Sequence, residues 1–307
     1  INNQLYLIYK GYYILSINYM DEIQSILEDC FKQISQKIQN YNSLSLGSIT
    51  KHKNQSDDQV KKLDLLADEL LTLNLLKCSQ IRNIASEESD SMISTSNKNA
   101  PYLICFDPLD GSSNIDINIT VGTIFAIYKY NNNKIKNGNN IVMAGYCLFG
   151  GSTQMIIAKK NNVSMYQLIN QEFKVVEPNL KCPTQGNIYS FNESNKNSWC
   201  DVRYNQLTND LINQKYNMRW VGSMVADAHR TLIKGGIFAY PGNNKNRNGK
   251  IRLLYEAYPF AYVFEQANGL SSDGFKDILN IDFPDDIHQK TPIILSSRYE
   301  LNYFNLL

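Results

Sequence analysis

The strongest constraint on the fold is that helical and strand periodicities alternate along the chain. Residues 21–38 and 59–78 carry apolar side chains at the three- and four-residue spacings of amphipathic helices. The short apolar or β-rich runs that predict strands in this half are 81–85, 102–106, 121–130, 141–148, 154–159 and 163–168. The polar residues 47–58 predict a mobile loop. This alternation favours an α/β protein over an all-helical or all-β protein.

The pattern changes after Cys182-Pro183. The segments expected there are strands at 187–191 and 237–240 and helices at 204–215, 224–234 and 253–267, with Ser223 as a helix cap. We therefore predict two subdomains with a boundary near residue 181, namely 1–181 and 182–307.

Composition excludes several classes of protein. The 307 residues hold 30 Lys plus Arg and 29 Asp plus Glu, so a net charge of +1 argues against a partner that is a nucleic acid or a membrane surface. No apolar run approaches the roughly 20 residues that cross a bilayer. The six cysteines form no C-x-x-C pair, and the first fifteen residues lack a signal-peptide pattern. Free thiols in a reducing compartment, the cytoplasm, are expected.

The most informative stretch is Phe-Asp-Pro-Leu-Asp-Gly-Ser-Ser-Asn at residues 106–114, where a predicted strand ends. Pro108 forces a turn, so Asp107 and Asp110 can face the same point. Gly111 allows close approach of the backbone to a ligand, and the residues after it, Ser112 and Ser113, offer N–H and hydroxyl donors. Two carboxylates beside such donors suit a cation and a phosphate together. The alternative is an acidic surface turn followed by a helix cap.

Three further carboxylates belong to the same pattern. Glu87 and Glu88 follow the strand at 81–85, and on an extended backbone they point in opposite directions, so one can bind metal while the other handles a proton. Glu256 lies at the start of the predicted helix 253–267. Taken singly, these residues fit a solvated turn and a favourable charge at a helix N-terminus. In combination, the carboxylates form a predicted site for two or three Mg²⁺ ions: Glu87, Asp107, Asp110 and Glu256.

A phosphate substrate also needs cationic and polar contacts. Lys250 and Arg252 flank Ile251, so an extended backbone puts both on one face. The other candidates for a second phosphate are Asn192, Arg219 and Tyr240. Each of these basic residues alone is also consistent with a solvated surface charge. His229 is interpreted as a packed or capping histidine, and His52 and His288, in polar loops, form no ligand pair.

Together these segments resemble fructose-1,6-bisphosphatase of class 1, within the lithium-sensitive sugar phosphatase superfamily. The matching segments are DQVKKLD (58–64), SEE (86–88), DPLDGSSNID (107–116), VGTIF (121–125), VGSMVADAHR (221–230), GGIFAYP (235–241) and GKIRLLYE (249–256). The resemblance implies a layered α-β-α-β-α fold with mixed sheets. It also implies hydrolysis of the 1-phosphate of fructose 1,6-bisphosphate to fructose 6-phosphate, a cytoplasmic reaction of gluconeogenesis.

The resemblance gives each motif residue an expected role. The metal ligands are the four carboxylates named above and the Leu109 carbonyl. Asp64 and Glu88 resemble the pair that activates water, and Asp58 lies on the loop that closes over the metals. The 1-phosphate cradle corresponds to Gly111, Ser112 and Ser113, and the 6-phosphate and sugar contacts correspond to Asn192, Tyr240, Lys250 and Arg252. Arg219 resembles an arginine that a neighbouring subunit supplies, so a homotetramer is expected. The implied cofactor is Mg²⁺, two or three per subunit, with Mn²⁺ or Zn²⁺ as alternatives.

Two departures from the family pattern concern binding. Trp220 stands where the family often has Tyr, which alters the predicted 6-phosphate contacts. Residues 15–20 lack the Gly-Thr-Gly-Glu-like turn that binds AMP in many animal members, so weak or absent AMP inhibition is expected from this potential AMP-type domain.

Two other functions remain open from the residues. Sedoheptulose-1,7-bisphosphatase shares the acidic motif, although residues 221–230 and the Tyr240-Pro241 pair favour the fructose enzyme. The second is a non-catalytic sugar-phosphate sensor with the same fold. A protein that had lost catalysis would be expected to lose carboxylates, and every expected carboxylate is present.

Overall fold

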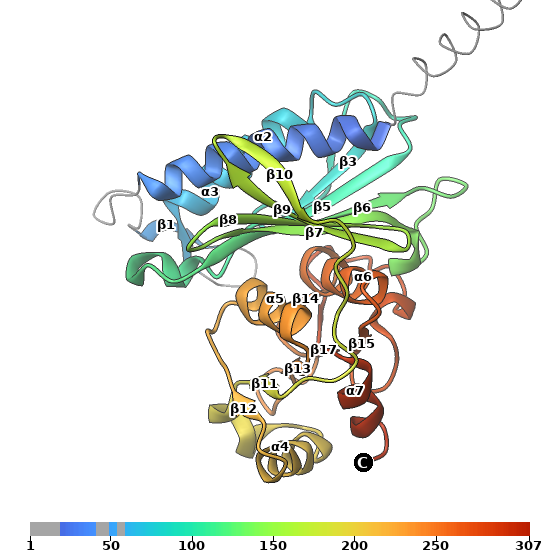
Figure 1. Ribbon diagram of the computed structural model, residues 1–307. Coiled ribbons are helices and arrows are strands. Elements are labelled where there is room, and N and C mark those ends of the chain that lie inside the picture. Colours follow the sequence, from blue (N-terminus) through green and yellow to red (C-terminus); the bar gives the residue numbers. More distant parts are fainter. Residues whose placement is uncertain (1–18, 41–48, 54–58) are drawn as a thin grey trace, which may run out of the picture.

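The computed structural model describes residues 19–40, 49–53 and 59–307, and it has five layers (Figure 1). Helices α2 (Tyr19–Gln39) and α3 (Lys62–Leu75) cover the outer face of an eight-stranded sheet. Helices α5 (Met224–Lys234) and α6 (Tyr258–Gln266) lie between that sheet and a second, five-stranded sheet. The outermost layer contains α4 (Arg203–Asn213) and α7 (Arg298–Phe304). The expected layered α-β-α-β-α architecture with mixed sheets is confirmed.

The eight-stranded sheet has the order β10-β9-β8-β7-β6-β5-β3-β4. Its strands are β3 (Ile81–Ser86), β4 (Ile93–Ser94), β5 (Tyr102–Asp110), β6 (Val121–Lys129), β7 (Ile141–Phe149), β8 (Thr153–Lys159), β9 (Asn162–Ile169) and β10 (Glu172–Glu177). Only β3 and β5 pair in parallel among these strands. Their carboxyl ends therefore meet at one edge of the sheet.

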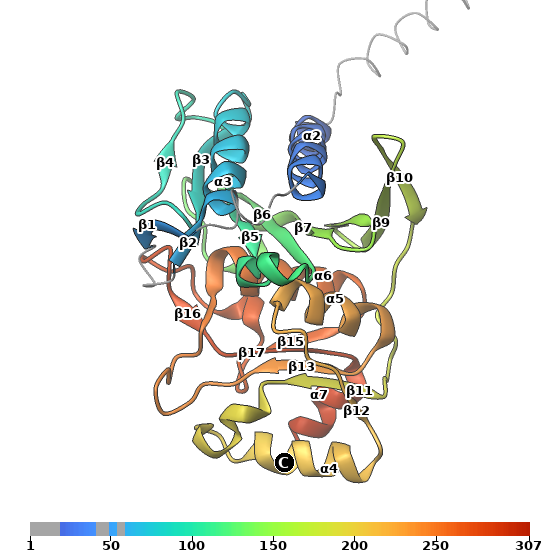
Figure 2. The same ribbon diagram turned by 90° about the vertical axis from the view of Figure 1, so that its left-hand side faces the viewer.

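The five-stranded sheet has the order β12-β11-β13-β17-β15 (Figure 2). Its strands are β11 (Ile188–Phe191), β12 (Asn217–Met218), β13 (Ile237–Tyr240), β15 (Leu270–Ser272) and β17 (Ile293–Ser296). The first three strands in spatial order are parallel, so their carboxyl ends also share an edge. Short ladders join β1 (Ile49–Lys53) to β2 (Gln59–Lys61) and β14 (Ile251–Arg252) to β16 (Lys290–Thr291).

Short helical segments complete the described part of the chain. The 3₁₀ segments are η1 (Ser112–Ile117), η2 (Gly138–Asn140), η3 (Glu193–Ser198) and η5 (Ile278–Asn280). Segment η4 (Leu253–Ala257) is a π-helix that runs directly into α6. Within residues 19–40, 49–53 and 59–307, no helix is both long and apolar enough to cross a membrane.

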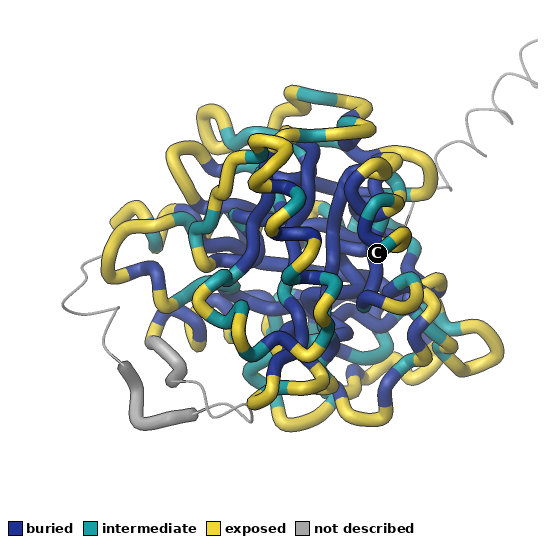
Figure 3. Tube along the Cα trace, turned by 90° about the horizontal axis from the view of Figure 1, so that it is seen from below, coloured by how far each residue is buried: buried dark blue, intermediate teal, exposed yellow. Residues whose placement is uncertain are grey.

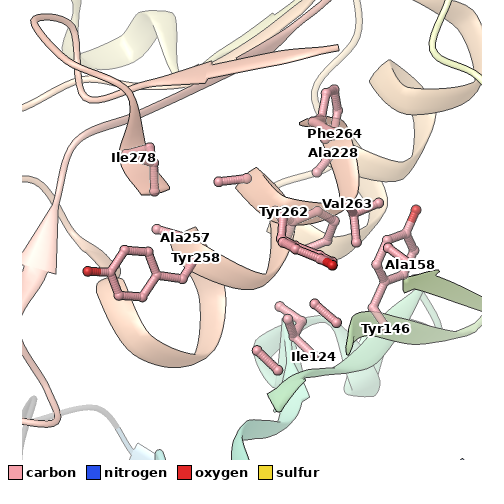
Figure 4. Close-up of a cluster of buried hydrophobic side chains, with 14 of the residues drawn as sticks. Ile124, Tyr146, Ala158, Ala228, Ala257, Tyr258, Tyr262, Val263, Phe264 and Ile278 are labelled. Carbon is pink, nitrogen blue, oxygen red and sulfur yellow. The ribbon is translucent and has the colours of Figure 1, made fainter. Parts of the chain in front are cut away.

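The largest apolar core fills the space between the eight-stranded sheet and α6. Side chains of α6 face Ile124, Tyr146 and Ala158 from three neighbouring strands (Figure 4). The Tyr146 and Phe260 rings are stacked with their centroids 4.7 Å apart. Viewed from below, the central strands are buried and the exposed residues lie mainly in peripheral loops (Figure 3). Helix α6 is therefore apolar on nearly all sides because it is enclosed by two sheets.

The structure corrects three predictions of local structure. The helix predicted over 59–78 begins at Lys62, because residues 59–61 form strand β2. Residues 49–53 form strand β1, although their polar composition predicts a loop, because backbone pairing with β2 needs no apolar alternation. The helix predicted over 253–267 begins as the π-helix η4. The short strands β15 and β17 and helix α7 were not predicted, although β17 is an apolar run.

Replacing a stacked core ring tests the packing between layers. We expect Phe260→Ala to lower the free energy of unfolding by about 3–5 kcal/mol, because a fully buried ring is removed and its cavity cannot close completely. Phe275→Ala is the matched control: that ring is 85% exposed, and its loss should cost less than about 1 kcal/mol. Urea unfolding of both variants gives the comparison, and equal losses would contradict the proposed importance of this layer.

Candidate active site

Three carboxylates converge where the first sheet meets the π-helix. One ligand oxygen from each of Asp107, Asp110 and Glu256 lies within 4.8 Å of the others. The β5 strand loses its regular register with β6 between Asp107 and Asp110, and this irregularity lets both side chains reach the same point. The Thr123 hydroxyl fixes the irregular segment by donating to the Pro108 carbonyl at 2.8 Å. On the other side, the Arg252 N–H donates to Glu256 Oε2 at 2.5 Å.

Glu87 joins this edge of the sheet through the parallel pairing of β3 with β5. Ser86 is paired with Phe106, and the Glu87 N–H donates to the Phe106 carbonyl at 3.1 Å, so Glu87 lies beside Asp107. The Glu87 carboxylate forms an ion pair of 2.9 Å with the Arg252 guanidinium. Arg252 was predicted as a sugar-phosphate contact, and the structure places it against a predicted metal ligand.

Burial and mutual repulsion disfavour the ionised form of these carboxyl groups. Burial, followed by the charges of Glu87, Asp110 and Glu256, raises the pKa of Asp107 well above its usual range. Burial raises the pKa of Glu256 to about 8, although Arg252 opposes the shift. Burial also raises the pKa of Asp110 to about 6, although Val225 N–H donates to its Oδ2 at 2.8 Å. The cluster can therefore be ionised only if a positive charge lies beside it.

The donor set fits a divalent cation. Its ligand atoms are carboxylate oxygens, with the Leu109 carbonyl in the same turn, and oxygen ligands suit Mg²⁺ or Mn²⁺. The Asp107 carboxylate is held in place, because the Leu109 N–H donates to its Oδ1 at 2.9 Å. A bound cation would reverse the mutual repulsion and return the carboxyl groups to the ionised form.

Glu88 lies near two acidic residues of helix α3, Asp64 and Asp68. Burial raises the pKa of Glu88 to about 8, and the charges of Glu87, Asp64 and Asp68 add to the shift. Asp64 is only 4% exposed and lies in the first turn of α3. Asp68 follows one turn later on the same helix face and accepts a hydrogen bond from the Ser86 hydroxyl. Asp68 was not predicted as a site residue, although its four-residue spacing from Asp64 was a usable signal.

The backbone after Asp110 forms a tight cradle. Gly111 has a positive φ of 77°, and a side chain there would place its Cβ 2.6 Å from the Ser223 hydroxyl. The turn leads into η1, which begins with Ser112 and Ser113. The Asn114 amide nitrogen is buried near Gly111 and has no hydrogen-bond partner within the described residues. These donors at a helix start suit an anion.

Ser223 differs from its predicted role. It occupies the N-cap position of α5, but its side chain makes no cap hydrogen bond and donates instead to Asp110 Oδ2 at 3.2 Å. The Asp227 carboxylate holds the residues before the helix instead, because it accepts hydrogen bonds from the Val221 and Gly222 N–H groups, each at 2.9 Å. The start of α5 is thus tied to the acidic cluster rather than capped by its own serine.

Three predicted 6-phosphate residues lie at the shared edge of the second sheet. Asn192 directly follows β11, Arg219 directly follows β12, and Tyr240 is the last residue of β13; these strands are parallel neighbours. Their side chains are therefore brought to one edge, as in other α/β ligand sites. The Trp220 ring is stacked on Phe238 at 6.4 Å, in the same region.

Of the other residues named in the prediction, those that the structure describes belong neither to the acidic cluster nor to the edge of the second sheet. Lys250 is exposed directly before β14 and is not part of the acidic cluster. Asp58 lies outside the described residues, as do residues 15–18 of the segment on which the AMP prediction depends. His229 is packed as predicted, with its Nδ1 2.9 Å from the Tyr146 hydroxyl.

Fold and site together define a class of protein: a layered α/β phosphatase with an acidic metal site. Comparison with known proteins is more specific. Residues 14–178 match the family model "Fructose-1-6-bisphosphatase, N-terminal domain", and residues 182–306 match "Fructose-1-6-bisphosphatase, C-terminal domain". The chain belongs to the fructose-1,6-bisphosphatase family.

Individual relatives agree with this family. The chain is 46% identical to fructose-1,6-bisphosphatase class 1 of Sulfurihydrogenibium sp., covering 81% of this chain and 79% of that protein. It is 40% identical to fructose-1,6-bisphosphatase 1 of Rattus norvegicus, covering 93% of this chain and 82% of that protein. Among solved structures, it matches Leishmania major fructose-1,6-bisphosphatase in holo form with a TM-score of 0.90, 31% identity and 96% coverage of both chains.

The raised pKa values predict how the stability of the metal-free protein depends on pH. Glu88 and Glu256 bind a proton more tightly in the folded state than when unfolded, so their contribution is complete at low pH and is lost as pH rises through about 8. The unfolding temperature in EDTA should therefore fall between about pH 4.5, the ordinary pKa of a glutamate, and about pH 8, and Mg²⁺ should suppress the fall.

Scanning calorimetry measures this dependence. Glu256→Gln, which cannot ionise, is the control variant, and it should flatten the profile in EDTA. A metal-free unfolding temperature that stays constant or rises over this range would contradict the predicted coupling between the buried carboxyl groups and the cation.

Proposed function

We propose that the acidic cluster, the Gly111 cradle and the edge of the second sheet are the parts with which this enzyme of the fructose-1,6-bisphosphatase family hydrolyses the 1-phosphate of fructose 1,6-bisphosphate. The products are fructose 6-phosphate and phosphate. The observation that carries the proposal is the convergence of three carboxylates, two buried and one half-buried, beside a backbone cradle that suits an anion. A phosphate monoester has an extremely slow uncatalysed hydrolysis, and a site of this kind addresses that demand.

The metal-binding residues in this proposal are Glu87, Asp107, Asp110, Glu256 and the Leu109 carbonyl. When bound, two or three Mg²⁺ ions, or Mn²⁺ or Zn²⁺ in their place, would polarise the phosphoryl group, make water more acidic and neutralise the leaving oxygen. Arg252 has a double task, because its guanidinium pairs with Glu87 and its backbone N–H holds Glu256. It therefore sets the spacing between two of the carboxylates while it remains close to the substrate.

Glu88 is the proposed acceptor of the proton from the attacking water. In the metal-free protein its pKa is about 8, which lies near neutral pH, as a general base requires. Asp64 and Asp68 add negative charge that favours the protonated form of Glu88. Asp64 shares the activation of water; Asp58, to which the resemblance gives a catalytic role, lies outside the described residues.

The substrate is held at both ends. Gly111, Ser112 and Ser113 donate hydrogen bonds to the 1-phosphate at the start of η1. Asn192 and Tyr240 contact the 6-phosphate and sugar at the second sheet, and Lys250 and Arg252 contribute from the β14–β16 ladder. Binding at two separate phosphates orients the scissile bond against the carboxylates, so that much of the entropic cost of reaction is met on binding.

Assembly and location follow the same proposal. The Arg219 side chain is exposed, and its Nη1 donates a hydrogen bond of 2.8 Å to the carbonyl of the adjacent Met218. This exposure supports a role of Arg219 in the site of a neighbouring subunit. We infer a homotetramer that works in the cytoplasm. The ends of the two family-model matches at 178 and 182 support a domain boundary near residue 181.

Phosphate release in a Mg²⁺ titration tests the function. We expect Mg²⁺-dependent release of one phosphate, fastest from fructose 1,6-bisphosphate and slower from sedoheptulose 1,7-bisphosphate. A faster rate with the sedoheptulose substrate would replace the proposed substrate. No release from either substrate by the folded protein would favour a sugar-phosphate sensor.

Glu88→Gln tests the proposed base. The amide keeps the shape of the side chain but cannot accept a proton, so kcat should fall by roughly 10²- to 10⁴-fold. The Mg²⁺ midpoint should change little, because Glu88 is not among the proposed ligands. Glu69→Gln, at an exposed position of the same helix as Asp64, is the control and should keep the wild-type rate. A near-normal kcat for Glu88→Gln would remove Glu88 from the mechanism.

A further inference from the structure

His288 is a buried side chain to which the proposed function gives no role. It lies in the turn before β16 and is only 8% exposed, although its polar neighbours in sequence predict a solvated loop. Its backbone N–H donates to Asp286 Oδ1 at 2.9 Å, which fixes the turn. A buried imidazole needs partners for both ring nitrogens, and these partners identify what the side chain connects.

The His288 ring bridges two segments that are far apart in sequence. Its Nε2 lies 2.9 Å from the Ser89 carbonyl, and its Nδ1 lies 2.7 Å from the Tyr255 hydroxyl. A carbonyl only accepts, so Nε2 carries the hydrogen and donates it to Ser89. In the neutral ring, Nδ1 then accepts the hydrogen bond that the Tyr255 hydroxyl donates. The Tyr255 ring also packs edge-on against the imidazole, at 6.0 Å and 75°.

Each partner is the immediate neighbour of a site carboxylate. Ser89 follows Glu88, the proposed base, and Tyr255 precedes Glu256, a proposed metal ligand. Tyr255 is fully buried, so its backbone has little freedom to move. The bridge therefore connects the loop after β3 to the π-helix η4 behind the two carboxylates.

We propose that His288 is a positioning residue that fixes the Glu88 segment relative to the Glu256 segment during hydrolysis. This inference rests on the proposed function, because Glu88 matters to the rate only if it acts on the attacking water. His288 itself does not touch the reacting atoms and acts only through the backbone of Ser89.

The Glu88 segment needs such a connection because it carries like charges. On its first side, the Glu88 N–H donates to the Ser86 hydroxyl at 3.2 Å, and Ser86 in turn donates to Asp68 on α3. On its second side, the hydrogen bond from His288 to the Ser89 carbonyl holds the chain. The Ser89 N–H also donates to the Ser86 carbonyl at 3.2 Å, so the turn stays closed without His288. Loss of the His288 contact would instead release this turn from the Tyr255 segment, and Glu88 could then shift relative to the neighbouring carboxylates. A shift of about 1 Å in such a group can cost about 10²-fold in rate.

Two substitutions of His288 each keep one of the two hydrogen bonds of its ring and remove the other. The amide of His288→Asn is near the former Nδ1 and can still accept from Tyr255, but it does not reach Ser89. The longer side chain of His288→Gln brings its amide nitrogen near the former Nε2 and can donate to Ser89. For His288→Asn we expect kcat to fall by roughly 10- to 100-fold, with KM and the Mg²⁺ midpoint within about twofold of wild type. His288→Gln should recover most of that kcat.

His229→Asn is the matched control. His229 forms a similar pair with Tyr146, with a contact of 2.9 Å and an edge-on ring packing at 5.8 Å, but no acidic site residue adjoins that pair. The His229→Asn variant should lower the unfolding temperature about as much as His288→Asn does. Its kcat should remain within about twofold of wild type, because only stability is lost.

The outcomes distinguish this inference from the function on which it rests. If the wild type is active and His288→Asn is equally active, the inference is overturned but the proposed function is not. The same holds if the kcat of His288→Gln is no higher than that of His288→Asn. An equal kcat loss in His229→Asn would show a general effect of stability and would overturn it too. An inactive wild type would overturn the proposed function and the inference together.

Tyr255→Phe decides the question if His288→Asn does not fold. This variant keeps the buried ring and removes only the hydroxyl that orients the imidazole. We expect a lower kcat at unchanged KM, and a wild-type kcat in Tyr255→Phe would overturn the inference.

Discussion

The structure depends on holding buried carboxylates together against their mutual repulsion. Asp107 and Glu256 are almost entirely enclosed by protein, and the charges of Glu87 and Asp110 act on them at close range. Like charges in such an environment favour protonation or separation, and separation would require backbone segments to move. The bulged end of β5 and the π-helix η4 prevent that movement. The carboxylates that are held together in this way attract cations, and a bound metal ion would relieve their mutual repulsion.

The layered architecture explains how a substrate with two phosphates meets this cluster. Parallel strands place their carboxyl ends at one edge in each of the two sheets, and both edges carry polar side chains. The start of α5 connects the edges, because Ser223 and the Val225 N–H contact Asp110 while Trp220, just before the helix, lies at the second sheet. The five layers thus fix the distance between the two proposed phosphate sites on different sheets.

Much of this arrangement could be predicted from the sequence because its signals are local. The acidic turn at 107–111 and the strand before it are contiguous, and the period of α2 follows from its own side chains. The Arg252–Glu87 ion pair was not predicted, because each residue alone resembles a surface charge and only tertiary packing brings them together. Ser223 was misjudged for a related reason: a serine before a helix normally caps it, and the competing acceptor, Asp110, is distant in sequence.

His288 shows the same limit most clearly, and it suggests a general property of this site. Polar neighbours in sequence conceal a buried ring whose contacts, Ser89 and Tyr255, come from opposite parts of the chain. Arg252 works in the same way, since it holds Glu87 from one segment and Glu256 from another. In both cases a residue late in the chain fixes a carboxylate that follows β3. Neither half of the chain can therefore form the complete site alone, and the geometry for hydrolysis arises only when the layers have packed together.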